Sequence, residues 1–235
     1  MRIILVHGAW SDGRTWEAVA PLLTAAGHDV TAVTLPGHGA DGKAPGEVGM
    51  ADYAAHVAGI AAEGAPALLV GHSMGGMVIS AAADLAPEAV RKLVYVAALL
   101  PRSGQSLLDL IKTQQTRGVA DAVRPADQPG ATVLVPEQAA DALFQDATPE
   151  QRAQAMTRFV PQPNKGQTDR VDLTEARFGS LPRAYVFCTE DRTVTYPLQQ
   201  AMEAASPCAE RFTLDCGHLP QLTRPAALSE ILAAL

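Results

Sequence analysis

The feature that most constrains the fold is a serine flanked by glycines, placed between an apolar run and a helical pattern. Residues 71–75 read Gly-His-Ser-Met-Gly, with Leu69 and Val70 before them and an alanine-rich segment after them. This order predicts a strand, a sharp turn and a helix, because a glycine two positions to either side of the serine lets strand and helix approach without a Cβ clash. Such a turn pushes the hydroxyl out above the sheet. Ser73 is therefore the first candidate nucleophile.

Short apolar runs alternate with helical patterns on both sides of this turn. Strands are expected at residues 2–6, 29–34, 67–70, 92–97, 183–188 and 211–214. The alternation predicts an α/β fold with a doubly wound, mostly parallel sheet of about six strands flanked by helices.

The regular alternation lapses between residues 101 and 180. Helical patterns near 107–115, 137–144 and 149–159 favour an inserted helical cap there. We therefore expect a single-domain chain, with an α/β core at 1–100 and 181–235 and a cap at 101–180.

Charge and apolar patterning argue against several partners. The net charge is −7 and the sequence has no basic block, which is unlike a nucleic-acid-binding surface. The longest apolar run, residues 93–100, is far too short to cross a bilayer. The beginning of the chain lacks the apolar segment and cleavage site of a signal peptide. We expect a cytoplasmic protein that binds neither nucleic acid nor membranes.

The cysteines and glycines give no sign of a metal or a cofactor. Cys188, Cys208 and Cys216 lack the spacing of a disulfide framework or of a metal site, so we expect buried free thiols. Residues 71–76 contain neither the lysine of a phosphate-binding loop nor a Gly-x-Gly-x-x-Gly pattern. The sequence therefore predicts no metal and no cofactor.

Other predicted strand ends supply partners for Ser73. Reactive groups of an open α/β sheet gather at the carboxyl ends of its strands. His218 follows the last predicted strand and Asp191 follows the strand that ends at Cys188. The order Ser73, Asp191, His218 is the nucleophile, acid and base order of α/β-hydrolases.

Two other carboxylates, Glu190 and Asp215, remain alternatives for the acid. Two further histidines, His7 and His72, adjoin the predicted site. Because His72 precedes the nucleophile, it should turn into the fold and make a structural hydrogen bond.

Acyl transfer also needs donors for the tetrahedral oxygen and a pocket for the substrate. Backbone N–H groups of the residue after the nucleophile and of a loop after an early strand commonly form the oxyanion hole, which indicates Met74 and Ala9. We expect an apolar pocket lined by Gly8, Trp10, Leu107, Phe144, Met156, Phe159 and Leu219.

The sequence resembles a known family, the α/β-hydrolases that include plant methyl esterases and hydroxynitrile lyases, with related bacterial esterases. The resemblance covers nearly the whole chain and rests on residues 5–9, 71–76, 177–180, 188–191 and 217–218. It implies an α/β-hydrolase fold with Ser73, Asp191 and His218 as the triad, and with Ala9 and Met74 as oxyanion donors.

The same resemblance bears on the reaction. Lyases of this type typically carry threonine after the first loop histidine and lysine after the base, whereas this chain has Gly8 and Leu219. We therefore predict a serine hydrolase that cleaves carboxylic esters of small to medium apolar substrates through an acyl-enzyme. A hydroxynitrile lyase and a non-catalytic small-molecule binding protein on the same fold are the alternatives. The expected partner is a small-molecule ester, and a homodimer is left open.

Overall fold

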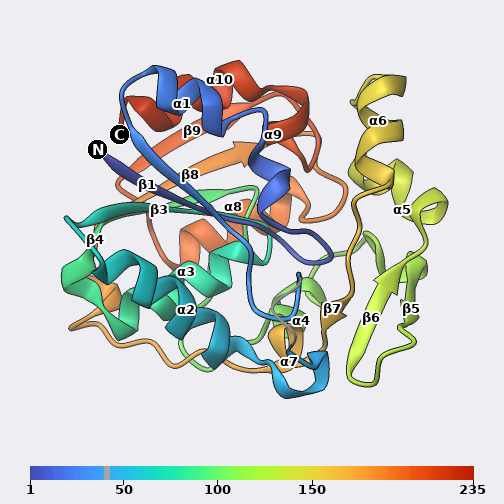
Figure 1. The fold of residues 1–235 in the computed structure, drawn as a ribbon, viewed down its shortest axis with the longest axis horizontal. Helices are drawn as coiled ribbons and strands as arrows, with labels where there is room; N and C mark the ends of the chain where they lie inside the picture. The colour runs from blue at the N-terminus through green and yellow to red at the C-terminus, as the bar shows by residue number, and fades with distance from the viewer. Residues whose placement is uncertain (40–42) are drawn as a thin grey trace.

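A six-stranded parallel sheet runs through the centre of the computed structural model (Figure 1). The structure describes residues 1–39 and 43–235. In chain order the strands are β1 (Arg2–Val6), β2 (Asp29–Val33), β3 (Ala67–His72), β4 (Val90–Val96), β8 (Arg183–Cys188) and β9 (Glu210–Leu214). Their spatial order is β2-β1-β3-β4-β8-β9, and every neighbouring pair is parallel. The predicted doubly wound α/β sheet is confirmed.

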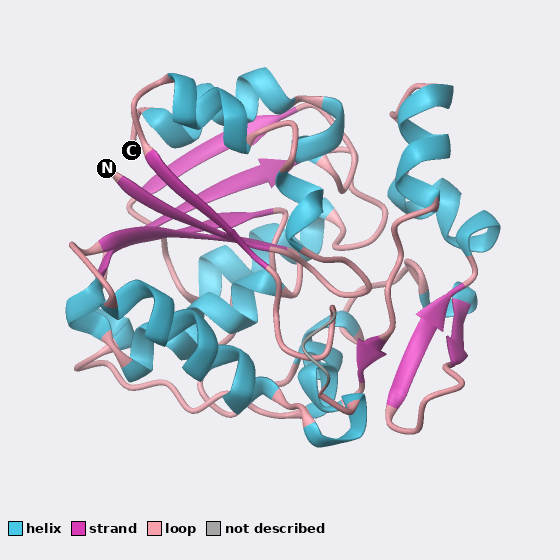
Figure 2. Ribbon diagram, in the orientation of Figure 1, coloured by secondary structure: helices cyan, strands magenta, loops and turns pink. Residues whose placement is uncertain are grey.

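Helices cover both faces of this sheet (Figure 2). One face carries α1 (Ala20–Ala25) and α10 (Pro225–Ala233). The other face carries α2 (Met50–Ala62), α3 (Gly75–Leu85) and α8 (Tyr196–Ala205). Because crossover helices shield both faces, strands of such a sheet are apolar at successive positions rather than at alternate ones.

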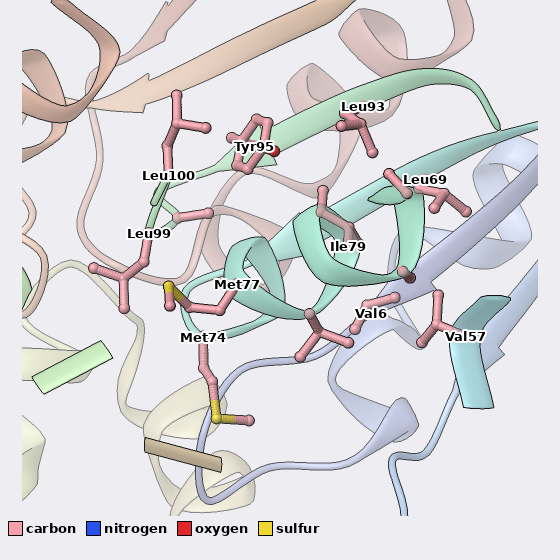
Figure 3. Close-up of a cluster of buried hydrophobic side chains, with 14 of the residues drawn as sticks. Val6, Val57, Leu69, Met74, Met77, Ile79, Leu93, Tyr95, Leu99 and Leu100 are labelled. Carbon is pink, nitrogen blue, oxygen red and sulfur yellow. The ribbon is translucent and has the colours of Figure 1, made fainter. Parts of the chain in front are cut away.

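The strand β1 illustrates this double burial. Its residues Ile3 and Leu5 belong to the apolar cluster under α1 and α10, whereas Ile4 and Val6 belong to the cluster under α2 and α3. Figure 3 shows the second cluster, in which Val6 lies with side chains of β3, β4, α2 and α3. Successive side chains of a strand point to opposite faces, so one short run fills two cores.

The register brings the strand ends that matter to one edge. Gly71 of β3 pairs with Val6 of β1 and with Tyr95 of β4, and Val96 of β4 pairs with Val186 of β8. The loops that follow β1, β3, β4, β8 and β9 therefore leave the sheet on the same side. This is the edge at which ligands bind in open α/β sheets.

We call residues 101–180 the insertion. Most of its elements lie to one side of the central sheet, at the right of Figure 1. It contains α4 (Leu107–Ile111), β5 (Val123–Pro125), β6 (Ala131–Leu134), α5 (Pro136–Leu143), α6 (Pro149–Met156), β7 (Gln162–Pro163) and α7 (Lys165–Thr168). The insertion contains the expected helices and, in addition, an antiparallel sheet of β5, β6 and β7 that the sequence did not indicate. Strands this short carry too few residues for a two-residue apolar period to be visible.

The insertion has its own small apolar cluster. Ala122, Leu134, Ala139, Ala140, Leu143 and Phe144 are buried in it. The remaining elements are α9 (Pro220–Thr223) and 3-10 turns at Gly13–Trp16, Pro45–Glu47, Pro87–Ala89, Ala120–Ala122 and Phe178–Ser180. No helix within the described residues is both long enough and apolar enough to span a membrane.

Candidate active site

Ser73 occupies the turn between β3 and α3, as the glycine pattern predicted. Its φ is +54°, in the left-handed region that residues other than glycine rarely adopt. A Cβ on Gly71 would lie 2.5 Å from the Gly75 carbonyl oxygen, and a Cβ on Gly75 would lie 2.6 Å from that of Val6. Both glycines are therefore needed for the close approach of β3, α3 and β1. The Ser73 N–H donates to the Val96 carbonyl at 3.3 Å, and the Ser73 carbonyl accepts from Leu99 N–H at 3.0 Å.

Ser73, His218 and Asp191 form one chain of hydrogen bonds. The Ser73 Oγ is 3.0 Å from His218 Nε2, and His218 Nδ1 is 2.7 Å from Asp191 Oδ2. An ionised carboxylate can only accept, so Nδ1 carries the proton and Nε2 is free to accept the serine hydroxyl. The His218 and Asp191 side chains are 3% and 0% exposed, so water does not compete for their contact.

Several donors fix the Asp191 carboxylate. Its Oδ1 accepts from the backbone N–H groups of Thr193 at 2.7 Å and Val194 at 2.9 Å, and its Oδ2 also accepts from Gln199 Nε2 at 3.2 Å. Gln199 is fully buried on α8, and its Oε1 accepts from the Cys188 N–H at 3.0 Å. The sequence reasoning missed Gln199. The available signal was a glutamine placed one position after Leu198 and three before Met202, on the side of α8 that carries these apolar residues.

The alternative acids lie elsewhere. Glu190 and Asp215 are both exposed, whereas Asp191 is buried. The Asp215 carboxylate accepts from the Thr189 hydroxyl at 3.0 Å, not from the imidazole. Asp191 is the carboxylate that the structure brings to His218.

Two buried histidines hold backbone carbonyls on either side of Ser73. His7 Nδ1–H donates to the Gly8 carbonyl at 2.7 Å, and its Nε2 accepts from Leu35 N–H at 3.0 Å. Burial, together with the neighbouring His38, lowers the pKa of His7 to about 3, so its ring is neutral. His72 Nε2–H donates to the His218 carbonyl at 2.8 Å, which confirms the structural hydrogen bond expected for it. Burial and the nearby His218 ring lower the pKa of His72 well below its usual value.

The two candidate oxyanion donors flank the serine. A Cβ on Gly8 would lie 2.9 Å from Ser73 Cβ, so the loop that carries Gly8 and Ala9 lies against the nucleophile. Met74 directly precedes the first residue of α3, where backbone N–H groups lack helical partners. Within residues 1–39 and 43–235, neither the Ala9 nor the Met74 N–H donates a hydrogen bond. The Met74 side chain itself is fully buried and belongs to the apolar cluster drawn in Figure 3.

Two cavities meet at Ser73. The first, which we call the His218 cavity, has a volume of about 110 Å³ and includes His72, His218 and Leu219 in its lining. The second, which we call the Leu107 cavity, has a volume of about 350 Å³. Five of the residues predicted for the pocket line the His218 cavity: Gly8, Trp10, Phe144, Phe159 and Leu219. Two line the Leu107 cavity, namely Leu107 and again Trp10.

Met156 is the exception among the predicted pocket residues. It is half-buried at the end of α6 and packs against the apolar cluster of the insertion. Neither cavity includes it in its lining, so its placement in the pocket was wrong. Apolar residues of a short amphipathic helix commonly pack against its own supporting layer, and here Ala155 and Phe159 reach the cavity instead.

The insertion also contacts the loops that carry the acid and the base. Gln145 Nε2 donates to the Glu190 carbonyl at 2.8 Å, next to Asp191. The Asp146 Oδ2 accepts from the Gly217 N–H at 2.9 Å, next to His218. A Cβ on Gly217 would lie 2.5 Å from Asp146 Oδ1, so any larger residue there would displace the end of the Asp146 side chain. The insertion therefore contacts the loops that carry Asp191 and His218 as well as the two cavities at Ser73.

The cysteines are free and buried, as predicted. Cys188 and Cys216 lie next to each other, with their sulfur atoms 3.6 Å apart. Across the part of the chain that the structure describes, no group of three or more histidine, cysteine or acidic side chains is arranged to hold a metal ion.

Known proteins share this arrangement of elements. Residues 3–231 match the model of the alpha/beta hydrolase family. Methylesterase 7 of Arabidopsis thaliana is 30% identical over 247 residues, which are 98% of this chain and 94% of that protein. A second relative from that plant, putative chloroplastic methylesterase 13, is 29% identical over 249 residues, and the chain spans only 56% of its length.

Among solved structures, the pyrethroid hydrolase of Sphingobium faniae JZ-2 superimposes with a TM-score of 0.89 at 28% identity, covering 100% of this chain and 96% of that one. This structural similarity over the whole chain agrees with the match to the family model. The chain belongs to the alpha/beta hydrolase family.

Proposed function

We propose that the protein is a serine-dependent carboxylic ester hydrolase that acts through an acyl-enzyme. The observation that carries this proposal is the hydrogen-bonded chain from Ser73 Oγ through His218 to Asp191. A protein that only binds a small molecule has no need of a nucleophile, a base and a buried acid in this order. The relatives named as methylesterases and as a pyrethroid hydrolase support the same chemistry.

The geometry suggests the following steps. Ser73 Oγ attacks the ester carbonyl while His218 Nε2 takes its proton, and Asp191 stabilises the imidazolium. The Ala9 and Met74 N–H groups bind the oxygen of the tetrahedral intermediate. His218 then returns the proton to the departing alcohol. A water molecule, activated by His218, releases the acid from Ser73.

The surroundings of the site favour small to medium apolar esters. Aliphatic and aromatic side chains form most of the lining of the Leu107 cavity, and Phe144, Phe159 and Leu222 form part of that of the His218 cavity. Leu219, next to the base, lines the His218 cavity and offers no positive charge to an anionic leaving group such as cyanide. Ester hydrolysis is therefore favoured over cleavage of a cyanohydrin.

Two measurements on the purified protein test the proposal. With p-nitrophenyl acetate, we expect an initial burst of p-nitrophenol close to one equivalent per protein, because acyl-enzyme accumulates before hydrolysis. A fluorophosphonate probe should label Ser73, and Ser73→Ala should abolish both the labelling and the burst. The matched control is Ser103→Ala, which alters an exposed serine of the insertion. Cyanide release from mandelonitrile without any ester hydrolysis, or labelling that survives Ser73→Ala, would contradict the proposal.

A further inference from the structure

Trp10 stands between the two cavities that meet at the nucleophile. Both cavities are lined by Ala9, Trp10, Ser73, Val119 and Thr193. Trp10 has by far the largest side chain of these shared residues, so its indole forms most of the wall between the two spaces.

The insertion holds this wall at three points. The Trp10 indole N–H donates to Thr132 Oγ1 at 3.2 Å, its backbone N–H donates to Gln162 Oε1 at 3.3 Å, and its carbonyl accepts from Val160 N–H at 3.1 Å. Trp10 has a φ of +54°, so its backbone is strained in the same way as that of Ser73. Strain of this kind persists only where the surroundings over-determine it, and it concentrates at functional sites.

The two cavities differ in what they offer to an ester. The lining of the His218 cavity includes the imidazole, whereas that of the Leu107 cavity does not. Because His218 must protonate the departing alkoxide, the alcohol has to leave on the side of the His218 cavity. The acyl group, which remains bonded to Ser73, then extends into the Leu107 cavity.

Size and polarity agree with this assignment. The Leu107 cavity is the larger, about 350 Å³ against about 110 Å³, and aliphatic side chains such as Leu99, Leu108 and Ile111 line it. The His218 cavity carries the ion pairs of Arg14 with Asp12 and of Arg158 with Glu17, with N–O distances of 2.6 and 2.5 Å. Half of the Glu17 side chain and more than half of that of Arg14 are exposed, so this end of the cavity faces water.

We propose that Trp10 is the residue that divides the site into an acyl compartment, the Leu107 cavity, and an alcohol compartment, the His218 cavity. The enzyme then selects esters whose apolar acyl group is bulkier than their alcohol, and Trp10 sets that preference. This inference rests on the proposed ester hydrolysis and adds the orientation of the substrate to it.

Two series of esters test the assignment, with release of acid followed by a pH indicator. One series lengthens the acyl group from ethyl acetate to ethyl hexanoate, and the other lengthens the alcohol from ethyl acetate to hexyl acetate. A methylene that fits an apolar pocket changes kcat/KM by about tenfold or more. We expect the wild type to gain at least tenfold along the acyl series and less than threefold along the alcohol series.

Two matched variants then identify the compartments. Leu107→Phe should lower kcat/KM for ethyl hexanoate at least tenfold and change that for hexyl acetate less than threefold. Leu219→Phe should show the opposite pattern. If Leu107→Phe impairs the alcohol series instead, the assignment of the compartments is wrong.

Substitutions of the wall itself test the role of Trp10. Trp10→Ala joins the two spaces and should reduce the ratio of kcat/KM between ethyl hexanoate and hexyl acetate at least tenfold. Trp10→Phe keeps a wall and should retain most of that ratio. Thr132→Val removes only the hydrogen bond to the indole and should lie between the two. An unchanged ratio in Trp10→Ala would overturn the role of Trp10.

The outcome also separates this inference from the proposed function. If the ratio of kcat/KM between the two esters does not depend on Trp10 while the fluorophosphonate still labels Ser73, only the division into two compartments is contradicted. If the fluorophosphonate does not label Ser73 in the wild-type protein, the proposed serine-dependent ester hydrolysis is contradicted. If Trp10→Ala fails to fold in a thermal melt, Thr132→Val tests the wall instead, because loss of the hydrogen bond to the indole should still lower the ratio. An unchanged ratio in Thr132→Val would then contradict the role of Trp10.

Discussion

The α/β core and the insertion contribute to the candidate site in different ways. Ser73, Asp191 and His218 follow β3, β8 and β9 of the core, where strand register and backbone contacts leave little freedom. The insertion supplies side chains that enclose the substrate space, including Leu107, Phe144 and Phe159. The backbone of the core therefore places Ser73, Asp191 and His218, whereas side chains of the insertion form most of the Leu107 cavity and part of the His218 cavity.

This division implies that reaction and selectivity can be altered separately. Substitutions of Ser73, Asp191 or His218 should reduce turnover of every ester. Substitutions in the insertion should change which ester is preferred, except where the insertion reaches the catalytic loops. The following experiments test that distinction.

The largest effect should follow removal of the nucleophile. Ser73→Ala should lower kcat for p-nitrophenyl acetate by about 10⁶-fold, as expected when a triad nucleophile is lost. Phe159→Ala, in the insertion, should cost at most about 100-fold in kcat/KM, since it alters only the enclosure. If Ser73→Ala loses less than 100-fold in kcat and its thermal melt is unchanged, Ser73 is not the nucleophile.

The acid should come next. Asp191→Asn keeps the shape but presents the wrong hydrogen-bonding partner to the imidazole, so kcat should fall by about 10⁴-fold. Asp215→Asn is the matched control, because Asp215 is an exposed carboxylate on the same loop as His218. It should change kcat less than threefold. A larger effect of Asp215→Asn than of Asp191→Asn would move the acid to Asp215.

A smaller effect should appear where the insertion contacts the catalytic loops. Asp146→Ala removes the acceptor for the Gly217 N–H and should lower kcat about fivefold, which corresponds to a hydrogen bond of about 1 kcal/mol. The control is Asp141→Ala, because the Asp141 side chain is 88% exposed on α5. Equal kcat values for both variants would mean that the insertion affects only binding.

The last prediction concerns the stability of the core towards acid, where we expect no effect on turnover. The pKa of His7 is about 3 in the folded protein and 6.5 in the unfolded chain. Between these pH values the unfolded chain binds a proton at His7 and the folded protein does not. The contribution of neutral His7 to the free energy of unfolding is therefore complete above pH 6.5 and is lost as the pH falls towards 3. His72, with a pKa also lowered, acts in the same direction.

Urea denaturation at several pH values measures this loss. His7→Asn, which does not titrate, should reduce the slope between pH 6 and 4 by about 1 kcal/mol per pH unit. His56→Asn, at an exposed position of α2, should leave the slope unchanged. An unaltered slope in His7→Asn would show that His7 is protonated in the folded protein.

The sequence predicted the core better than the insertion, for a physical reason. Buried parallel strands are continuous apolar runs, and a serine between closely packed strand and helix requires glycines, so both features are visible locally. The strands β5, β6 and β7 are stabilised by pairing with one another and by the small cluster around Phe144. Such support depends on distant residues and leaves little trace in a short segment.

The same reason explains what was missed within the site. Gln199 reaches Asp191 only because α8 packs against the end of β8, and no spacing rule indicates that contact. The meeting of two cavities at Trp10 depends on Thr132 and Gln162, which lie far along the chain. Met156 was misplaced because an apolar residue on a short helix can face either the cavity or the supporting cluster.

Gln145 and Asp146 of the insertion contact the core loops next to Asp191 and His218. These contacts limit how freely the insertion can be exchanged while the α/β core is kept. An insertion exchanged with that of another hydrolase would leave the Glu190 carbonyl and the Gly217 N–H without their partners, unless it brought an amide and a carboxylate to the same places. A side chain added at Gly217 would displace the ends of the Gln145 and Asp146 side chains, so a residue larger than glycine there would disturb the same contact. Chimeric enzymes built on this core should therefore be cut so that residues 145–146 and 217 come from one parent.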